Sequence, residues 1–249
     1  GERGHKSYND HAYAGLERAQ TELGIVFRTL ETGEGADREA AMRQLAAGDA
    51  RLIFGVGFLF SDDIRKLAIE FPDKKFACVD YTVNPGDTLP ANLAALKFKE
   101  EEGSYLVGAL AALLSTTGKV GFVGGMQIPL IKKFEAGYVA GAHKIDPQTG
   151  VDVKYAGVDG GAFKNPTKGK ELALAIYNGG ADIIYHASGS TGLGVFEAAR
   201  EKDKLAIGVD SDQQSAMPGH VLTSMIKRVD VAVFNTIKDA RDGTFPGGQ

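Results

Sequence analysis

The sequence predicts an α/β fold in which parallel sheets are covered by helices on both faces. Short apolar runs alternate with longer stretches of helical periodicity, as expected when helical crossovers join parallel strands. Several of the short runs are rich in Val, Ile and Phe and are apolar on both sides, which indicates burial on both faces of a sheet. The chain also contains 33 glycines among 249 residues, about twice the usual share, which fits many tight turns between strand and helix.

Eight strands and seven helices are expected from these patterns. The strands are residues 24–30, 51–56, 75–79, 119–123, 151–156, 182–186, 205–209 and 221–224. The helices are residues 12–23 after a start signal at 7–10, then 61–71, 101–114, 130–144, 166–178, 191–201 and 229–242. Ser61 is expected to cap the second helix, which Pro72 ends. Asn165 is expected to cap the fifth, which the glycine pair at 179–180 ends.

Two lobes are favoured over a (β/α)₈ barrel, which the length and the repeated units would also fit. Residues 80–98 contain turn-forming residues and a weak extended run but no room for a helix, so this segment is expected to cross between lobes. The predicted lobes are residues 1–97 with 224–249, and residues 98–223. A parallel sheet would require a strand before the first helix and another after the last, so the natural chain is expected to extend beyond both ends.

Composition and motifs argue against several classes of function. The 28 Lys and Arg against 32 Asp and Glu give a net charge of −4, which is unsuited to a nucleic-acid-binding protein. The single cysteine, Cys78, excludes an intrachain disulfide and lies in a run expected to be a buried strand. The five histidines show no paired metal spacing, and no HExxH, GxSxG, GxGxxG or GxxxxGK[ST] motif occurs. We therefore expect a non-enzymatic binding protein with no cofactor and no metal.

The candidate binding residues follow strands or begin helices, where open α/β sheets bind ligands. Asn9 and Tyr13 are four residues apart and share one helix face, which suits a flat heterocycle or a sugar. Asp80 and Asp210 each follow an apolar strand and offer carboxylates to hydroxyl or N–H groups. Each of these residues also has a purely structural explanation, as a cap or a half-buried ring.

Three further candidates come from the second half of the chain. Phe163 is an apolar ring in a glycine-rich turn, and Ser188 with Gly189 offers backbone N–H groups at a helix start. Lys227 follows the last short strand. Phe163 could instead serve local packing. Lys227 could instead be an ordinary solvent-exposed lysine.

Four motifs in this order resemble the basic membrane protein family of bacterial substrate-binding lipoproteins, and the resemblance spans nearly the whole chain. They are GHKSYND at 4–10 with Ala-Gly-Leu at 14–16, GFVGGM at 121–126 with FEAGY at 134–138, GVDSDQ at 208–213, and LTSMIKRVD at 222–230. The resemblance implies a type I periplasmic-binding fold, with two Rossmann-like lobes, a hinge and a ligand cleft. It also implies delivery of a purine nucleoside to an ABC permease.

The resemblance carries residue roles as well. It implies that the base is held between Tyr13 and Phe163, one ring from each lobe. The other positions that match the family's ligand contacts are Asn9, Asp80, Ser188, Gly189, Asp210 and Lys227. It further implies a location in the periplasm or on the outer face of the cytoplasmic membrane, with any lipid anchor outside this chain.

One departure from the family is His5, which stands where the family usually has an acid. If that position contacts ligand, His5 is expected to alter base or ring preference, or to make binding sensitive to pH near about 6–7. Three alternatives remain open at this point. They are a sugar or autoinducer-type ligand, a ligand-sensing domain of a receptor or repressor, and a nucleoside-cleaving enzyme.

Overall fold

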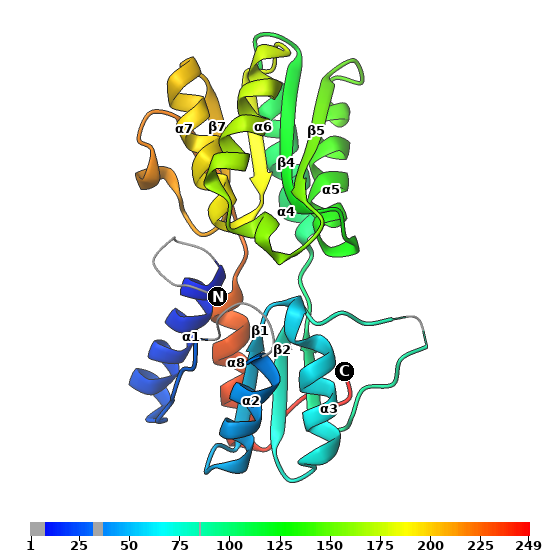
Figure 1. The fold of residues 1–249 in the computed structure, drawn as a ribbon, viewed down its shortest axis with the longest axis vertical. Helices are drawn as coiled ribbons and strands as arrows, with labels where there is room; N and C mark the ends of the chain where they lie inside the picture. The colour runs from blue at the N-terminus through cyan, green and yellow to red at the C-terminus, as the bar shows by residue number, and fades with distance from the viewer. Residues whose placement is uncertain (1–7, 32–36, 85) are drawn as a thin grey trace. The chain divides into compact units, whose positions relative to one another are not determined.

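The predicted α/β fold with parallel sheets is confirmed by the computed structural model, which describes residues 8–31, 37–84 and 86–249 (Figure 1). The described chain forms two compact units. Apart from Tyr8, which is grouped with the second unit, the first combines residues 9–98 with 228–249, and the second is continuous over residues 99–227. The chain therefore passes from one unit to the other after Phe98 and again after Lys227.

The first unit is built on a parallel sheet in the order β1 (Leu52–Val56), β2 (Lys75–Val79), β3 (Leu93–Leu96). Its helices are α1 (Tyr8–Leu23), α2 (Asp37–Ala47), α3 (Ser61–Glu70) and α8 (Val229–Asp242). The central strand β2 carries fully buried Phe76, which packs with Ile64 and Leu67 of α3. Cys78 is also fully buried there, as its apolar run predicted.

The first and last helices pack together in this unit. A side-chain carbon at Gly15 of α1 would lie 2.6 Å from the Asp230 carbonyl oxygen of α8. One turn along, the Arg18 guanidinium lies 3.8 Å from the centre of the Phe234 ring. Close backbone approach therefore requires glycine at position 15, and the first and last helices pack directly against each other.

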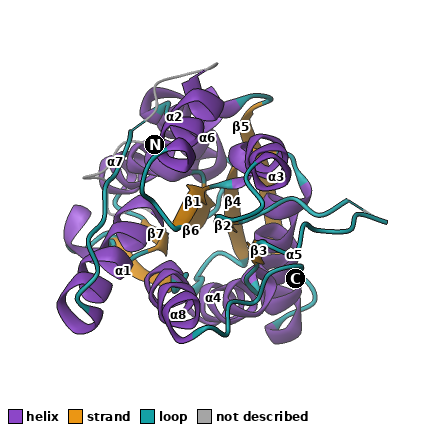
Figure 2. Ribbon diagram, turned by 90° about the horizontal axis from the view of Figure 1, so that it is seen from below, coloured by secondary structure: helices purple, strands orange, loops and turns teal. Residues whose placement is uncertain are grey.

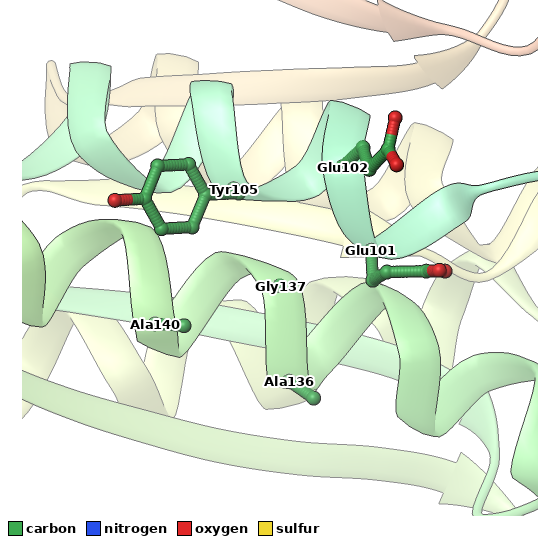
Figure 3. Close-up of a pocket in the computed structure, with 6 residues that line it drawn as sticks. All are labelled: Glu101, Glu102, Tyr105, Ala136, Gly137 and Ala140. Atoms are coloured by element: carbon green, nitrogen blue, oxygen red, sulfur yellow. The ribbon is translucent and has the colours of Figure 1, made fainter.

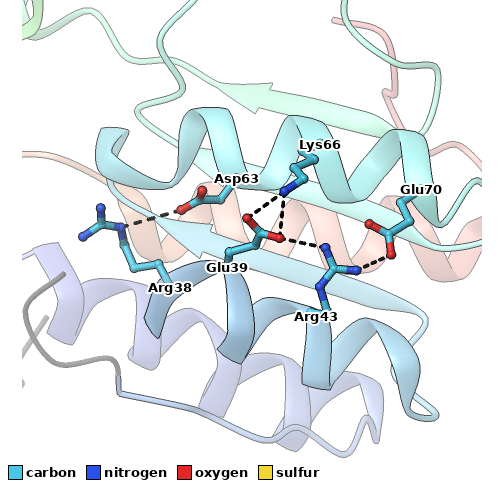
Figure 4. Close-up of polar contacts among 6 residues, drawn as sticks. All are labelled: Arg38, Glu39, Arg43, Asp63, Lys66 and Glu70. Atoms are coloured by element: carbon cyan, nitrogen blue, oxygen red, sulfur yellow. Dashed lines mark hydrogen bonds and ion pairs between the residues drawn. The ribbon is translucent and has the colours of Figure 1, made fainter. Parts of the chain in front are cut away.

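A polar network joins α2 to α3 (Figure 4). The Glu39 carboxylate accepts hydrogen bonds from Arg43 at 2.7 Å and Lys66 at 3.0 Å, and Arg43 also contacts Glu70. Arg38 lies 3.8 Å from Asp63 in a separate pair between the same two helices. Because all of these side chains are 28–61% exposed, each pair contributes only about 0–1 kcal/mol. The stability of the unit therefore depends on its apolar core.

The second unit contains a five-stranded parallel sheet in the order β5–β4–β6–β7–β8. These strands are β4 (Lys119–Met126), β5 (Gly150–Gly157), β6 (Ile183–Ala187), β7 (Leu205–Asp210) and β8 (Val221–Ile226). One apolar cluster packs α4 (Glu100–Leu114) and α5 (Pro129–Ile145) on the sheet, and another packs α6 (Pro166–Asn178) and α7 (Gly192–Lys202). Figure 2 shows strands with helices outside them. The sheet is thus buried on both faces, as its apolar strands predicted.

Helices α4 and α5 approach closely enough for their backbones to touch. A side-chain carbon at Gly108 would overlap the Tyr138 carbonyl oxygen, and one at Gly137 or Gly141 would overlap the carbonyl oxygen of Glu101 or Tyr105. Only glycine allows this separation. Among the described residues, no helix has both the length and the apolar character that crossing a bilayer requires.

Three expectations were wrong in detail. Residues 24–30 form no strand; Val26 is 93% exposed, and Phe27 packs its ring on Tyr13 instead of entering the sheet. Ser61 is the first residue of α3 rather than its cap, because its hydroxyl donates to the Phe58 carbonyl at 2.7 Å and accepts from the Thr82 N–H at 2.9 Å. Helix α2 was not predicted, since its apolar stripe is short. Asn165 does cap α6, accepting from the Lys168 N–H at 2.9 Å.

Candidate ligand-binding site

Two aspartates end parallel strands in an unusual backbone conformation, one in each unit. Asp80 follows β2 with φ 60°, and Asp210 ends β7 with φ 68°. Both are only 8% exposed. The left-handed region is unfavourable for residues with a side chain, although aspartate tolerates it better than most, and such outliers gather at functional sites. The third example among described non-glycine residues, Asp203, is the exposed end of α7, where this conformation is ordinary.

The surroundings of Asp80 are largely buried strand. Its backbone N–H donates to the Leu96 carbonyl at 2.9 Å, which ties the turn to β3. Burial raises the pKa of the Cys78 thiol, and the negative charge of Asp80 raises it further. The thiol is therefore protonated at neutral pH, and Cys78 is unsuited to act as a nucleophile.

Helix α1 carries the other two candidates of the first unit. Asn9 and Tyr13 are one turn apart near the beginning of the helix, and both are partly exposed. The Tyr13 ring meets Phe27 edge-on, with ring centres 5.6 Å apart and planes at 80°. Sequence reasoning missed Phe27 as a neighbour because it was assigned to a strand. An edge-to-face partner of this kind restricts the orientation of the tyrosine ring.

Phe163 is held by its backbone and its ring in the second unit. It ends a short turn (Gly160–Phe163) after β5, and its ring covers Gly125 of β4, where any side chain would overlap it. Its carbonyl accepts from the Ser190 hydroxyl at 3.1 Å. Gly189 has φ 58°, and a side-chain carbon there would lie 2.9 Å from the same carbonyl oxygen. The turns that carry Phe163 and Gly189 are therefore in direct contact and joined by a hydrogen bond.

Lys227 is buried in an ion pair, which the sequence did not indicate. Its ammonium lies 3.0 Å from Glu100 Oε1, and the two side chains are 4% and 1% exposed. Glu100 also contacts Lys133 of α5. The Lys227 backbone N–H donates to the Asp210 carbonyl at 2.9 Å. The only sequence signal for Glu100 was its place in the acidic start of a helix, which more commonly indicates solvated residues.

A tyrosine completes this polar cluster. The Tyr185 hydroxyl lies 3.1 Å from the Ser104 hydroxyl, and both residues are buried. Burial raises the pKa of Tyr185, and the negative charges of Asp210 and Glu100 raise it further. The phenol therefore remains neutral beside two carboxylates and can donate a hydrogen bond.

Each unit thus gathers its own candidates. In the second unit, Phe163, Ser188, Gly189, Asp210 and Lys227 all lie at or just beyond the carboxyl ends of strands β5 to β8. In the first, Asp80 lies at the carboxyl end of β2, whereas Asn9 and Tyr13 lie on α1. His5 falls outside the described residues. Within the part of the chain that is described, no cluster of three or more His, Cys, Asp or Glu side chains could hold a metal ion.

A depression of about 430 Å³ lies elsewhere, between α4 and α5 (Figure 3). It exists because Gly137, Ala136 and Ala140 leave space beside Tyr105, and the Glu101 and Glu102 side chains lie at one end of it. None of the predicted binding residues lines it. The small side chains at the contact between α4 and α5 therefore account for this depression.

Comparisons with known proteins agree over the whole chain. The family described as ABC transporter substrate-binding protein PnrA-like (Bmp) matches residues 1–249. A CD4+ T-cell-stimulating antigen of Listeria monocytogenes is 37% identical, over 98% of this chain and 72% of its own length. The ABC transporter nucleoside-binding protein BmpA of Lactococcus lactis is 33% identical, over 98% and 73%. A solved solute-binding protein of an ABC transporter system from Aeropyrum pernix K1 has a TM-score of 0.89 and 33% identity, covering 100% of this chain and 70% of that one.

Proposed function

Because the chain belongs to the PnrA-like family of ABC transporter substrate-binding proteins, we propose that it binds a purine nucleoside and delivers it to an ABC permease. The observation that carries the proposal is the pair of strand-end aspartates, Asp80 and Asp210, held in left-handed backbone with little exposure. The Lactococcus relative, named as a nucleoside-binding protein, supports the choice of ligand class. Relatives named as lipoproteins support a location in the periplasm or on the outer face of the cytoplasmic membrane, which we propose for this chain.

Each unit would supply one aromatic ring and one carboxylate. Tyr13 and Phe163 would stack on the base, at about 1–3 kcal/mol per ring by analogy with nucleobase stacking. Asp80 would accept hydrogens from two ribose hydroxyls, and Asp210 would accept them from the base or the ribose. Each such charge-assisted hydrogen bond contributes about 1.5–3 kcal/mol.

The remaining candidates would complete the polar contacts. Asn9 would offer an amide beside Tyr13, and the Ser188–Gly189 turn would offer backbone N–H groups. Lys227 would present its ammonium from within the pair with Glu100. The resemblance further implies hinge closure around the ligand, which we propose for this chain. The net charge of −4 favours nucleosides over nucleotides, because a phosphate would be repelled.

Calorimetric titration with adenosine, guanosine, inosine, uridine, ribose and AMP tests the ligand class. We expect a purine nucleoside to bind most tightly and AMP to bind less tightly than adenosine. Tighter binding of ribose than of every nucleoside would reject the purine assignment and favour a sugar-binding protein. Release of free base during incubation would instead reveal a nucleoside-cleaving enzyme.

Variants with asparagine test the two aspartates without adding backbone strain, because asparagine also tolerates the left-handed region. Asp80→Asn and Asp210→Asn should each weaken nucleoside binding by about 1.5–3 kcal/mol. The matched control is Asp203→Asn, which has a similar φ of 50° but caps the end of α7. Nucleoside affinity equal to wild type in either of the first two variants would remove that aspartate from the site.

A further inference from the structure

Buried hydrogen bonds join the loops that follow β6 and β7 in the second unit. Gln213 Oε1 accepts from the Val209 N–H at 2.9 Å and lies 3.1 Å from His186 Nε2. On the other side of the imidazole, His186 Nδ1 lies 3.3 Å from the Ser188 hydroxyl. His186, Ser188 and Gln213 are all buried. Val209 immediately precedes Asp210, so the network connects two of the proposed ligand-contacting positions.

The donors and acceptors in this network can be assigned from its chemistry. The Val209 N–H can only donate, so the Gln213 atom that faces it is the amide oxygen, which can only accept. His186 Nε2 must then carry the proton that it donates to the same oxygen. His186 Nδ1 is therefore the acceptor, and the Ser188 hydroxyl donates to it.

The surroundings of the imidazole favour its neutral form, and it is this form that leaves Nδ1 able to accept. Burial lowers the pKa of His186 to about 4, although the hydrogen bond with Gln213 opposes the shift. The Phe196 ring meets the imidazole edge-on, with ring centres 5.1 Å apart. Near neutral pH the ring is uncharged, and its proton is available to Gln213.

The backbone around the network leaves room for both side chains. A side-chain carbon at Gly208 would lie 2.5 Å from Ser224 Oγ and 2.7 Å from Gln213 Oε1. A side-chain carbon at Gly192 would overlap the His186 ring. The Gln213 backbone N–H also donates to Ser224 Oγ at 3.0 Å, which fixes the residue against β8. Two glycines thus admit His186 and Gln213 into an otherwise closed space.

We propose that His186 and Gln213 are positioning residues for the ligand site, and this inference rests on the proposed function. Neither is assigned a contact with ligand. The bonds from Ser188 through His186 and Gln213 to the Val209 backbone hold the two loops in one arrangement before ligand binds. Ligand binding then avoids the entropic cost of ordering them. The left-handed turn at Asp210 is kept in place by the same bonds.

Two substitutions of His186 separate the network from simple packing. His186→Leu removes both hydrogen bonds, whereas His186→Gln can keep a donor near the Nε2 position for Gln213. We expect His186→Leu to weaken adenosine binding by about tenfold or more, because the Gln213 oxygen loses one of its two donors and the Ser188 hydroxyl loses its acceptor. His186→Gln should recover most of that loss. His220→Leu is the control, because the His220 imidazole lies 3.1 Å from the Lys204 carbonyl and is not in the network.

Hydrogen exchange on the ligand-free protein supplies a second measurement that does not depend on adenosine. The Val209 and Ser211 amides should exchange faster in His186→Leu than in wild type, and His186→Gln should restore their protection. Unchanged exchange in His186→Leu, or wild-type adenosine affinity in that variant, would overturn the inference. If the wild-type protein binds no nucleoside while the exchange rates change as expected, the proposed function is wrong and the network's hold on the loops stands. Should His186→Leu fail to fold, Gln213→Leu is the alternative, and the same two outcomes decide.

Discussion

Replacing Lys227 by methionine tests the buried ion pair that lies at the carboxyl end of β8. The Lys227 ammonium is 3.0 Å from Glu100, and the Glu100 side chain is 1% exposed. Removing one partner of a buried pair costs about 3–5 kcal/mol, because the other charge loses its compensation. Glu100 would still contact Lys133, whose side chain is about one-third exposed. We therefore expect Lys227→Met to lower the free energy of unfolding by about 3 kcal/mol, at the low end of that range.

The double variant decides whether the buried charge is the cause. Lys227→Met combined with Glu100→Gln removes both charges, so it should be more stable than Lys227→Met alone, in spite of carrying an additional substitution. Urea unfolding of the ligand-free protein at neutral pH is measured for wild type, Lys227→Met, Glu100→Gln and the double variant. A loss in the double variant equal to the sum of the two single losses would refute the reasoning.

An exposed pair provides the matched control. Lys238 lies 2.9 Å from Asp242, nearly the distance found in the buried pair, but its side chain is about half exposed. Lys238→Met should change the free energy of unfolding by less than about 0.5 kcal/mol. If Lys238→Met lowered the free energy of unfolding as much as Lys227→Met, burial would not explain the contribution of the Lys227–Glu100 pair.

Three further predictions concern stability, each measured by urea unfolding. Gly108→Ala should cost at least about 2 kcal/mol, because the added methyl overlaps the Tyr138 carbonyl; a neutral result would contradict the close packing of α4 and α5. Burial raises the pKa of Asp182, but hydrogen bonds from residues 115–117 outweigh it and lower the pKa below its usual value. That stabilisation is present above pH of about 4 and is lost as pH falls through the lower folded pKa. Asp182→Asn should therefore lower the free energy of unfolding at pH 7, and its difference from wild type should shrink below about pH 4. A difference that stays constant with pH would argue against this role of the Asp182 carboxylate. Asp203→Gly should stabilise by about 0.5–1 kcal/mol by relieving a left-handed cap, and a loss would refute this.

The two sheets were predictable because central strands such as β2 and β6 are buried on both faces and therefore lack polar alternation. Strands β2, β6 and β7 all begin or end within one residue of the expected positions. The segment 24–30 shows the limit of that signal. It is as apolar as a strand, but strand formation also depends on a neighbouring backbone with open hydrogen-bonding groups, which a local pattern does not report. Its Phe27 ring packs on α1 instead.

The site was predictable only as far as local chemistry reaches. Asp80 and Asp210 were identified because each follows an apolar run, but their positive φ angles are visible only in three dimensions. Glu100 was not foreseen, because it comes from a different element than Lys227 and its isolated pattern is that of a solvated helix start. The partnership of His186 with Gln213 likewise joins residues on different strand ends. Sequence position indicated the candidates, and tertiary contacts determine what surrounds them.

The packing of α1 on α8 has a consequence for biosynthesis. Translation completes the whole continuous unit at 99–227 before α8 leaves the ribosome. Until then, the face of α1 around Gly15 and Arg18 has nothing to pack against from that helix. We therefore expect the first unit to complete its folding only after α8 emerges, and a nascent chain stalled before residue 228 to leave that surface of α1 uncovered.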